Sequence, residues 1–498
     1  MEDLFRQWAK EPAIKKTRIA ANGSNRQYYR LEGERYACVA AVNNDVRENE
    51  AFFYFADLLR KHHVLVPKVY AVSKDRTIYL QEDLGNNTLF AYLQSKAASG
   101  IDTSDETIAY YKRVLTDLLK IQQVSKSYTV NYSLAYPRPA MDRQALQWDF
   151  NYFKYNFLKL LHIPFDEQLL EDDFQQLEDY LLKDDNSFLV YRDFQSRNIM
   201  LTPSGKLFYI DFQGARQGSP FYDVASLLYS SKSNLTTSQR NILLEYYLDG
   251  FLHRFPHAGD NPSDASEATG KAGRPSRVAR RENLRNRYHM WVIARMLQTM
   301  GTYGYRGIYE GKEYFLRSIP LVLHNLKQVL SGHPLPLALP ELQKTWNCLF
   351  RLPEYQYYEN GLTVRVFSFS YRKGLPQDKS GNGGGYVFDC RSLPNPGRYP
   401  MYLSRTGCDD DVVDFFNADD HLPSMQNYLN HAYDMVDHHV EYFLQRKFTN
   451  LMVNFGCTGG RHRSVYCAEQ MAAHIRERYP DVRVVLRHLE HPELNRYE

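Results

Sequence analysis

Two short polar segments that flank one apolar strand constrain the fold of this chain more than any other feature. The first segment is Tyr191-Arg192-Asp193-Phe194-Gln195-Ser196-Arg197-Asn198. The second is Asp211-Phe212-Gln213, which directly follows the apolar run 207–210. An Asp on a tight loop can orient a hydroxyl, while an Asn and a second Asp after a strand can hold Mg²⁺ against the phosphates of ATP. The spacing therefore predicts a phosphotransferase centre, with Asp193 as its reactive carboxylate.

Length and composition favour several folded units. The chain has 498 residues, of which 43% are hydrophobic and 24% charged. A domain has about 150 residues as a soft prior, although one two-lobed kinase domain takes up two such units. We expect two or three compact units with buried cores.

The charge, the cysteines and the apolar runs exclude several classes of protein. The formal net charge of +3 gives no general argument for nucleic-acid binding. The six cysteines form no C-x-x-C pair, so reduced thiols in a cytosolic protein are the simplest interpretation. The N-terminus lacks a signal-peptide pattern, and no run reaches the roughly 18 apolar residues that span a bilayer. We expect a soluble cytoplasmic protein without a membrane partner.

Pattern changes along the chain predict two domains. Strand-like alternation up to about residue 85 predicts a small β-rich lobe, and helical periodicity over about 86–335 predicts a larger lobe. Within the latter, the small, polar and basic stretch 257–283 is predicted to be a flexible loop. Residues 336–355 follow a Pro- and Gly-containing segment and are predicted to be a linker. Residues 356–498 then read as a separate α/β domain, in which a strand at 451–455 runs into a glycine-rich loop and a helix.

The first 330 residues resemble the aminoglycoside-phosphotransferase-like kinases, and among them the anomeric amino-sugar (AmgK-like) kinases. The segments that carry the resemblance are the loop 23–30, Glu82-Asp83-Leu84-Gly85, the two polar segments described above and Tyr222-Asp223-Val224-Ala225. The resemblance implies an α+β fold with two protein-kinase-like lobes. It also implies ATP-dependent phosphorylation of N-acetylmuramate or N-acetylglucosamine at C1, in the recycling of cell-wall sugars.

The same resemblance assigns roles to individual residues. Asp193 is implied to be the catalytic base, and Asn198 and Asp211 the Mg²⁺ ligands. The implied ATP-binding residues are Ser24, Asn25, Arg26, Arg30, Glu82 and Leu84.

The chain departs from the family pattern at two positions. Tyr191 stands where His is usual, at a position that supports the loop and does not touch the substrate. The strand 36–42 lacks the lysine that normally pairs with the α- and β-phosphates, so either Arg26 or Arg30 supplies that charge or the nucleotide is held weakly. Asp223 is expected to cap a helix and brace the loop and not to react.

Residues 360–490 resemble the C-terminal domain of RapZ, an RNase adapter protein that senses glucosamine-6-phosphate and binds small RNAs. The resemblance rests on residues 387–396 and on the glycine-rich loop 456–464 with the helix after it. A strand that delivers such a loop to a helix N-terminus offers free backbone N–H groups to an anion. The predicted anion or sugar-phosphate site consists of Arg391, Gly456, Cys457, Thr458, Gly459, Gly460, His462, Arg463 and Ser464.

Three hypotheses follow. The first is an amino-sugar kinase whose C-terminal domain binds a phosphorylated sugar. The second is an adaptor with a weak or inactive kinase lobe, which binds protein, or RNA through basic residues near Arg483 and Arg487. The third is a bifunctional kinase and phosphatase, because the loop also satisfies C-x5-R-S with Cys457 as the nucleophile and Arg463 as the anion clamp. A helix-capping role for His462 and Arg463, without any ligand, is a further alternative.

Overall fold

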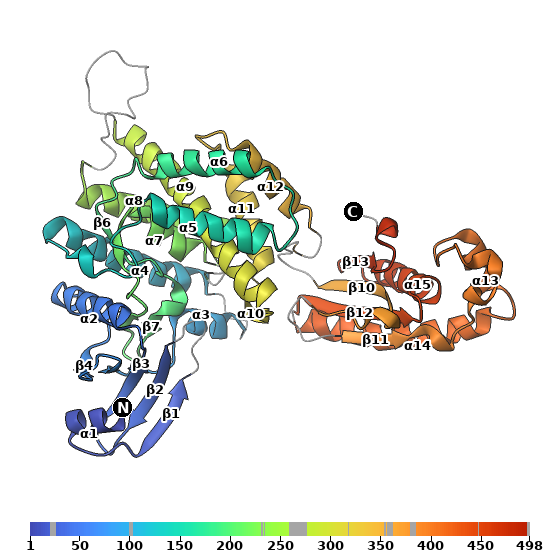
Figure 1. The fold of residues 1–498 in the computed structure, drawn as a ribbon, viewed down its shortest axis with the longest axis horizontal. Helices are drawn as coiled ribbons and strands as arrows, with labels where there is room; N and C mark the ends of the chain where they lie inside the picture. The colour runs from blue at the N-terminus through green and yellow to red at the C-terminus, as the bar shows by residue number, and fades with distance from the viewer. Residues whose placement is uncertain are drawn as a thin grey trace, which may run out of the picture. The chain divides into compact units, whose positions relative to one another are not determined.

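The computed structural model describes residues 1–19, 26–98, 103–230, 233, 235–257, 276–316, 318–352, 355, 362–378, 385–446 and 448–495 (Figure 1). Internal contacts divide the chain into two compact units. The first comprises Met1–Thr302 and Asn325–Asn347, and the second comprises Tyr303–His324 and Cys348–Glu498. No helix in the described ranges is long and apolar enough to cross a membrane.

The small lobe is built on a five-stranded antiparallel sheet with the order β1-β2-β3-β5-β4. Its strands are β1 (Lys15–Ile19), β2 (Gln27–Glu32), β3 (Ala37–Val42), β4 (Val69–Val72) and β5 (Ile78–Gln81). Helix α1 (Glu2–Ala9) precedes the sheet, and α2 (Val46–Lys61) connects β3 to β4. The predicted β-rich lobe is thereby confirmed.

Alternation along the strands gives this sheet two different faces. On one face, Leu31, Cys38 and Leu80 pack with Phe5 and Ala9 of α1. On the opposite face, Tyr79 stacks on Phe52 of α2, and the Phe52 ring also stacks on Phe212. The second face therefore adjoins the polar segment that begins at Asp211.

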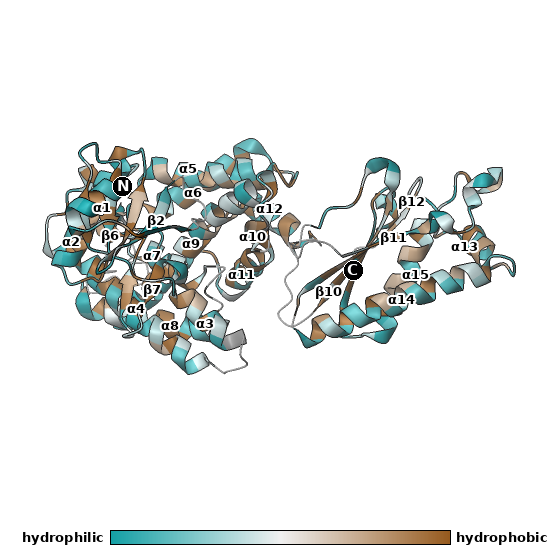
Figure 2. Cartoon of the chain, turned by 90° about the horizontal axis from the view of Figure 1, so that it is seen from below, coloured by the Kyte–Doolittle hydropathy of each residue, from teal (hydrophilic) through white to brown (hydrophobic). Residues whose placement is uncertain are grey.

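The large lobe is mostly helical, with two short antiparallel pairs of strands. β6 (Phe188–Val190) pairs with β9 (Arg216–Gly218), and β7 (Ile199–Leu201) pairs with β8 (Leu207–Tyr209). Its helices are α3 (Leu89–Ala98), α4 (Ser104–Ser127), α5 (Arg143–Phe153), α6 (Glu167–Leu181), α7 (Phe221–Leu228), α8 (Thr237–Arg254), α9 (Arg277–Tyr303) and α12 (Pro340–Phe350). Helix α10 (Glu313–Leu316) and the start of α11 (Ile319–Gly332) belong to the second unit. Hydrophilic and hydrophobic residues mix along these helices, as expected for helices that bury one side (Figure 2).

Two predicted segments differ from what the structure describes. Of the flexible loop predicted at 257–283, residues 258–275 lie outside the described residues, while α9 already begins at Arg277. Within the linker predicted at 336–355, α12 packs on α6, because the Leu342 N–H donates to the Asp173 carboxylate at 2.8 Å. The division into 1–335, 336–355 and 356–498 remains a prediction.

The second unit contains a four-stranded parallel sheet with the order β11-β12-β10-β13. Its strands are β10 (Thr363–Ser370), β11 (Gly385–Asp389), β12 (Asn450–Cys457) and β13 (Arg483–His488). The helices are α13 (Asp410–Asn417), α14 (Leu422–Gln445) and α15 (Arg463–Arg478). Apolar side chains from β10, β12, α14 and α15 form one core, which includes Val366, Val436, Val453 and Met471. The predicted α/β unit is confirmed.

Candidate active site

The two polar segments come together in the large lobe. Asp193 lies between β6 and β7, and Asp211 follows β8 after one residue. Asn198 connects the two segments, because its side-chain amide donates to the Asp193 carbonyl at 2.9 Å and to the Asp211 carboxylate at 3.1 Å. The side chain of Asp193 stays 37% exposed, so its carboxylate remains accessible to a substrate.

A buried carboxylate holds the loop that carries Asp193. Asp223, in the first turn of α7, accepts hydrogen bonds from the backbone N–H groups of Tyr191 at 2.6 Å and Arg192 at 2.8 Å. Arg192 has a φ of 80°, a left-handed conformation that a non-glycine residue adopts only when its surroundings hold it. Asp223 therefore braces the loop, as predicted. It does not cap α7, because the N-cap of that helix is Pro220. Burial raises the pKa of Asp223 to about 7.

Tyr191 supports both loops, as predicted. Its ring is buried, and its hydroxyl donates to the Ile210 carbonyl at 2.7 Å, directly before Asp211. The Asp211 carboxylate also accepts a hydrogen bond from the Gln213 amide at 2.9 Å. Burial and the neighbouring charge of Asp193 both raise the pKa of Asp211. Asp211 therefore sits where a bound cation would relieve a strong cost of ionisation.

The glycine-rich loop of the second unit lies at a switch point of the parallel sheet. β12 and β10 are neighbours, yet the chain leaves β10 toward β11 and leaves β12 toward β13 on the other side. The carboxyl ends of these two strands meet, since Ser370 pairs with Cys457. The loop then opens α15 at Arg463. Open parallel sheets bind ligands at such points, where N–H groups of the first helical turn lack acceptors within the helix.

The side chains of this loop are engaged with the backbone around it. His462 Nε2 lies 2.8 Å from the Tyr402 carbonyl, and Arg463 Nη1 donates to the carbonyls of Arg391 at 2.8 Å and Leu393 at 3.3 Å. Cys457 is buried, with its Sγ 3.2 Å from Ser464 Oγ. His462 and Arg463 therefore hold the segment 391–402 through its carbonyl groups. Their convergence on a phosphate stays a prediction.

Two other predicted members of this site have their own contacts. The Arg391 guanidinium binds the Asp389 carboxylate through Nε at 2.9 Å and Nη2 at 2.6 Å, and lies over the Tyr371 ring. The Thr458 carbonyl accepts a hydrogen bond from Ser370 Oγ at 2.8 Å. Ser370 of β10 therefore holds the backbone of the loop, whereas the side chain of Arg391 is exposed.

Two models of known protein families match separate parts of the chain. Residues 16–259 match the model of the phosphotransferase enzyme family (APH), and residues 362–491 match that of the RapZ C-terminal domain. The chain joins an APH phosphotransferase domain to a RapZ C-terminal domain. The predicted kinase-like fold with a C-terminal RapZ-like domain is thereby confirmed.

Individual relatives cover only parts of the chain. A nucleotide-binding protein of Methylobacillus flagellatus is 38% identical over 27% of this chain and 45% of its own length. A nucleotide-binding protein of Psychrobacter is 35% identical over 28% of this chain and 41% of its own length. This chain therefore spans less than half the length of these curated relatives.

Two solved kinase structures show a weak likeness. Plasmodium vivax ethanolamine kinase has a TM-score of 0.43 and 13% identity, over 63% of this chain and 82% of its own. The choline kinase LicA from Streptococcus pneumoniae has a TM-score of 0.40 and 14% identity, over 67% and 99%.

In the APH domain, Arg26 pairs with Glu48 of α2 and acts electrostatically on Asp211. Its side chain is buried, with Nη2 3.3 Å from the Glu48 carboxylate of α2, and it lies over the Phe52 ring. Its charge also lowers the pKa of Asp211, although burial and Asp193 outweigh it. A cation that pairs with a Glu of the helix after β3 resembles the ion pair that a kinase lysine makes.

Arg30 has a different task. Its guanidinium donates to both oxygens of Asp83, at 2.6 Å and 2.9 Å, and to Asn86 at 2.9 Å. Glu82 and Leu84 flank Asp83 directly after β5, where the two lobes join. Arg30 therefore fixes the hinge, and Arg26 is the better candidate for the missing charge. The predicted nucleotide residues Ser24 and Asn25 lie outside the described residues.

Two further residues act on Asp193 and were not predicted from the sequence. Arg295 of α9 places its Nη2 3.5 Å from the Asp193 carboxylate and donates from Nε to Ser226 at 3.2 Å. Asp149 of α5 is partly buried; burial raises its pKa, and the charges of Arg192, Arg295 and Arg216 oppose that rise. No local motif announces either residue, although an arginine inside the apolar run 290–297 is a signal that could have been followed.

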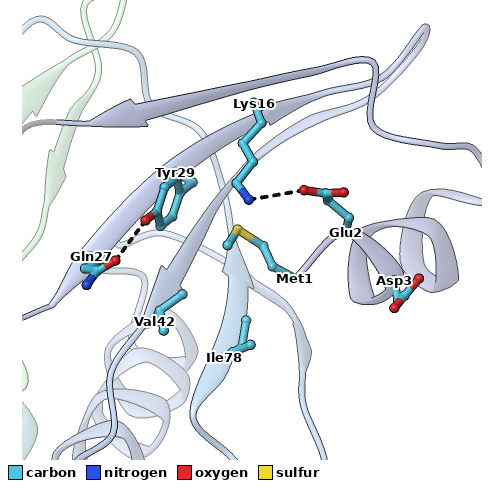
Figure 3. A pocket seen from close by; sticks show the side chains of 8 residues that line it. All are labelled: Met1, Glu2, Asp3, Lys16, Gln27, Tyr29, Val42 and Ile78. Carbon is cyan, nitrogen blue, oxygen red and sulfur yellow. Dashed lines mark hydrogen bonds and ion pairs between the residues drawn. The ribbon is translucent and has the colours of Figure 1, made fainter.

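A hollow of about 440 Å³ on the small lobe lies apart from this site. Its lining includes Met1, Lys16, Gln27, Val42 and Ile78 (Figure 3). Gln27, Val42 and Ile78 pair across the sheet on the face that α1 covers. Tyr28 and Tyr79, next to Arg26, point to the opposite face because neighbouring strand residues alternate. The hollow is therefore not part of the nucleotide site.

Proposed function

We propose that the APH domain transfers the γ-phosphoryl group of ATP to a hydroxyl of an amino sugar, N-acetylmuramate or N-acetylglucosamine at the anomeric position, and that the RapZ C-terminal domain binds an amino-sugar phosphate. The observation that carries the proposal is the convergence of Asp193, Asn198 and Asp211, which the Asn198 amide joins. Phosphoryl transfer needs these groups together, because catalysis rests on positioning and on charge stabilisation.

Asp193 would act on the acceptor. Its exposed carboxylate can accept the proton of the sugar hydroxyl as the new O–P bond forms and the bond between the γ-phosphorus and the leaving ADP oxygen breaks. The Asp223 brace and Arg295 hold the loop and the carboxylate while this happens. The Asp193 carboxylate then stays within hydrogen-bond distance of the sugar hydroxyl oxygen.

The residues around Asp211 fit a magnesium ion. Carboxylate and amide oxygens are the ligands that this hard cation prefers, and Asp211 and Asn198 offer both. Burial and the Asp193 charge raise the pKa of Asp211, and a bound cation would favour its ionised form. Asp211 and Asn198 would hold the ion, which would supply positive charge to the phosphates of ATP. Arg26, held by Glu48, would add positive charge beside the same phosphates.

Charge around Asp193 supports an acidic acceptor. Arg192, Arg295 and Arg216 all act electrostatically on Asp149 in this region. Burial and the nearby Arg192 lower the pKa of Arg216 to about 9, which indicates that cations crowd here. N-acetylmuramate carries a carboxylate that N-acetylglucosamine lacks. We therefore expect N-acetylmuramate to be the better acceptor.

The RapZ C-terminal domain would bind the phosphate group chiefly through its backbone. Its glycine-rich loop lies at the switch point between β10 and β12 and opens α15. An amino-sugar phosphate there would tie the output of the kinase to the concentration of a related metabolite.

Full-length protein with Mg-ATP and a panel of acceptors tests the proposal. The panel contains N-acetylmuramate, N-acetylglucosamine, choline, ethanolamine and an aminoglycoside, with products assigned by phosphorus NMR. We expect an anomeric phosphate from an N-acetylated sugar and a loss of about 10³-fold in kcat for Asp193→Asn. Asp172→Asn, at an exposed position on α6, is the matched control and should keep full activity. Transfer only to choline, ethanolamine or the aminoglycoside, or normal turnover by Asp193→Asn, would refute the proposal.

A further inference from the structure

Three side chains that are far apart in the sequence meet in the RapZ C-terminal domain. They are Cys408, just before α13, Glu469 on α15 and His488 at the end of β13. Cys408 Sγ lies 3.3 Å from Glu469 Oε1, and His488 Nε2 lies 3.2 Å from the same oxygen. The three ligand atoms all lie within 4.8 Å of one another.

These separations suit a tetrahedral cation. With metal distances of about 2.0–2.3 Å for nitrogen, oxygen and sulfur ligands, neighbouring ligand atoms in a tetrahedron stand roughly 3.4–3.6 Å apart. The two measured separations are close to that value, so small side-chain shifts would complete the site. A thiolate, an imidazole and a carboxylate together select a borderline-soft divalent ion such as Zn²⁺ over Mg²⁺ or Ca²⁺.

His488 is already oriented for ligation. Its side chain is buried, its Nδ1 lies 2.8 Å from Ser368 Oγ, and its backbone N–H donates to Asn495 at 2.7 Å. Metal-binding histidines are commonly held through their second ring nitrogen in this way. A serine hydroxyl can donate or accept, so it can serve the tautomer that leaves Nε2 free for a metal.

The cluster adjoins the glycine-rich loop. The Gly407 N–H, one residue before Cys408, donates to the Arg461 carbonyl at 2.9 Å. A Cβ on Gly407 would lie only 2.2 Å from the His462 carbonyl oxygen, so the two segments are in direct contact. Glu469 lies on the helix that the loop opens. A cation bound by the three side chains would therefore fasten the loop segment 456–464 to β13.

We propose that Cys408, Glu469 and His488 bind one zinc-class divalent cation, with a fourth position left for water, and that this cation stiffens the glycine-rich loop. The 31% exposure of the Glu469 side chain gives water access to the fourth position. Binding converts the Cys408 thiol to a thiolate and releases its proton to solvent. The proposal does not depend on the kinase reaction.

Cobalt titration of the chelator-treated full-length protein tests this site. Co²⁺ is added under reducing conditions with excess Mg²⁺, which occupies oxygen-ligand sites such as Asp211. We expect one equivalent of Co²⁺ per chain to produce a thiolate-to-metal charge-transfer absorption, which Zn²⁺ then displaces. Absence of that absorption would overturn the proposal.

Variants assign the absorption to the three residues. Cys408→Ser should abolish it, while Cys348→Ser, at another partly exposed cysteine, should leave it unchanged. Glu469→Gln should weaken Co²⁺ binding by about 100-fold. Because Gln keeps an acceptor oxygen and the size of Glu469, a folding defect would not explain that loss. Ser368→Ala should weaken binding by about 10- to 100-fold. An absorption that persists in Cys408→Ser, or unchanged affinity in Glu469→Gln, would show that the trio only hydrogen-bonds β13 to α15.

Discussion

The kinase centre and the glycine-rich loop bring polar groups together in opposite ways. Around Asp193, the Asn198 amide joins the Asp193 backbone carbonyl to the Asp211 carboxylate, and Arg295 lies 3.5 Å from the Asp193 carboxylate. In the RapZ C-terminal domain, the side chains of His462 and Arg463 contact carbonyl groups of the segment above the loop. The first centre is built from side chains supported by buried braces, whereas in the second the proposed ligand contact falls mainly to the backbone. Substitutions should therefore act through charge in the first and through loop shape in the second.

The largest effect is expected at Arg26. If Arg26 supplies the charge of the missing lysine, Arg26→Met should lower kcat/KM for ATP by about 10²- to 10³-fold, as the loss of one stabilising group does. Arg30→Met removes an equal charge from the hinge pair with Asp83 and should cost about tenfold or less. Steady-state kinetics with varied ATP compares the two variants. Equal losses would refute the assignment.

Folding of these variants can be followed separately. The chain has four tryptophans, and Trp8, Trp148, Trp291 and Trp346 all lie in the first unit. Denaturant unfolding monitored by tryptophan fluorescence therefore reports on the first unit within the full chain. A lower kcat/KM for Arg26→Met with an unchanged unfolding midpoint would assign the loss to the site.

The next effect concerns pH and the brace Asp223. Burial raises its pKa from 3.8 to about 7, so the folded state holds a proton that the unfolded chain releases between these values. The contribution of this group to the free energy of unfolding is therefore largest below about pH 4 and falls as pH rises toward 7. Across that window we expect a loss of up to about 3 kcal/mol from this residue.

Asp223→Asn removes this titration. The fluorescence-monitored free energy of unfolding should fall less between pH 5 and pH 8 in the variant than in the parent, while Asp172→Asn should behave as the parent does. Because an amide offers only one oxygen to the N–H groups of Tyr191 and Arg192, kcat should also fall. Parallel pH profiles for parent and variant would contradict the proposed cause.

Local spacing was enough to predict the parts of the molecule that depend on neighbouring residues. Asp193 and Asn198 lie between two short apolar strands and Asp211 closely follows a third, so local spacing predicts all three. The β-rich small lobe, and the order of strand β12, glycine-rich loop and helix α15, follow from alternation and periodicity in the same way.

What the sequence did not reveal depends on distant segments. Arg295 and Glu48 reach the site from α9 and α2, and only the tertiary fold brings them there. Helix α12 was missed because the proline-containing segment before it indicated a linker. Its buried side chains Leu342, Trp346 and Leu349 nevertheless recur at helical spacing.

The smallest effect tests whether loop shape controls the second site. Gly460 has a φ of 68°, and a Cβ there would lie 2.4 Å from Glu490 Cγ and 3.0 Å from the Ser370 nitrogen. Gly460→Ala must therefore shift the loop, and we expect about 10- to 100-fold weaker binding of glucosamine-6-phosphate by calorimetry. A Cβ on the adjacent Gly459 meets nothing within 4 Å, so Gly459→Ala should change affinity by no more than about twofold. If both variants bind as the parent does while Arg463→Gln loses binding, side chains and not the backbone hold the phosphate, and the contrast between the two centres disappears.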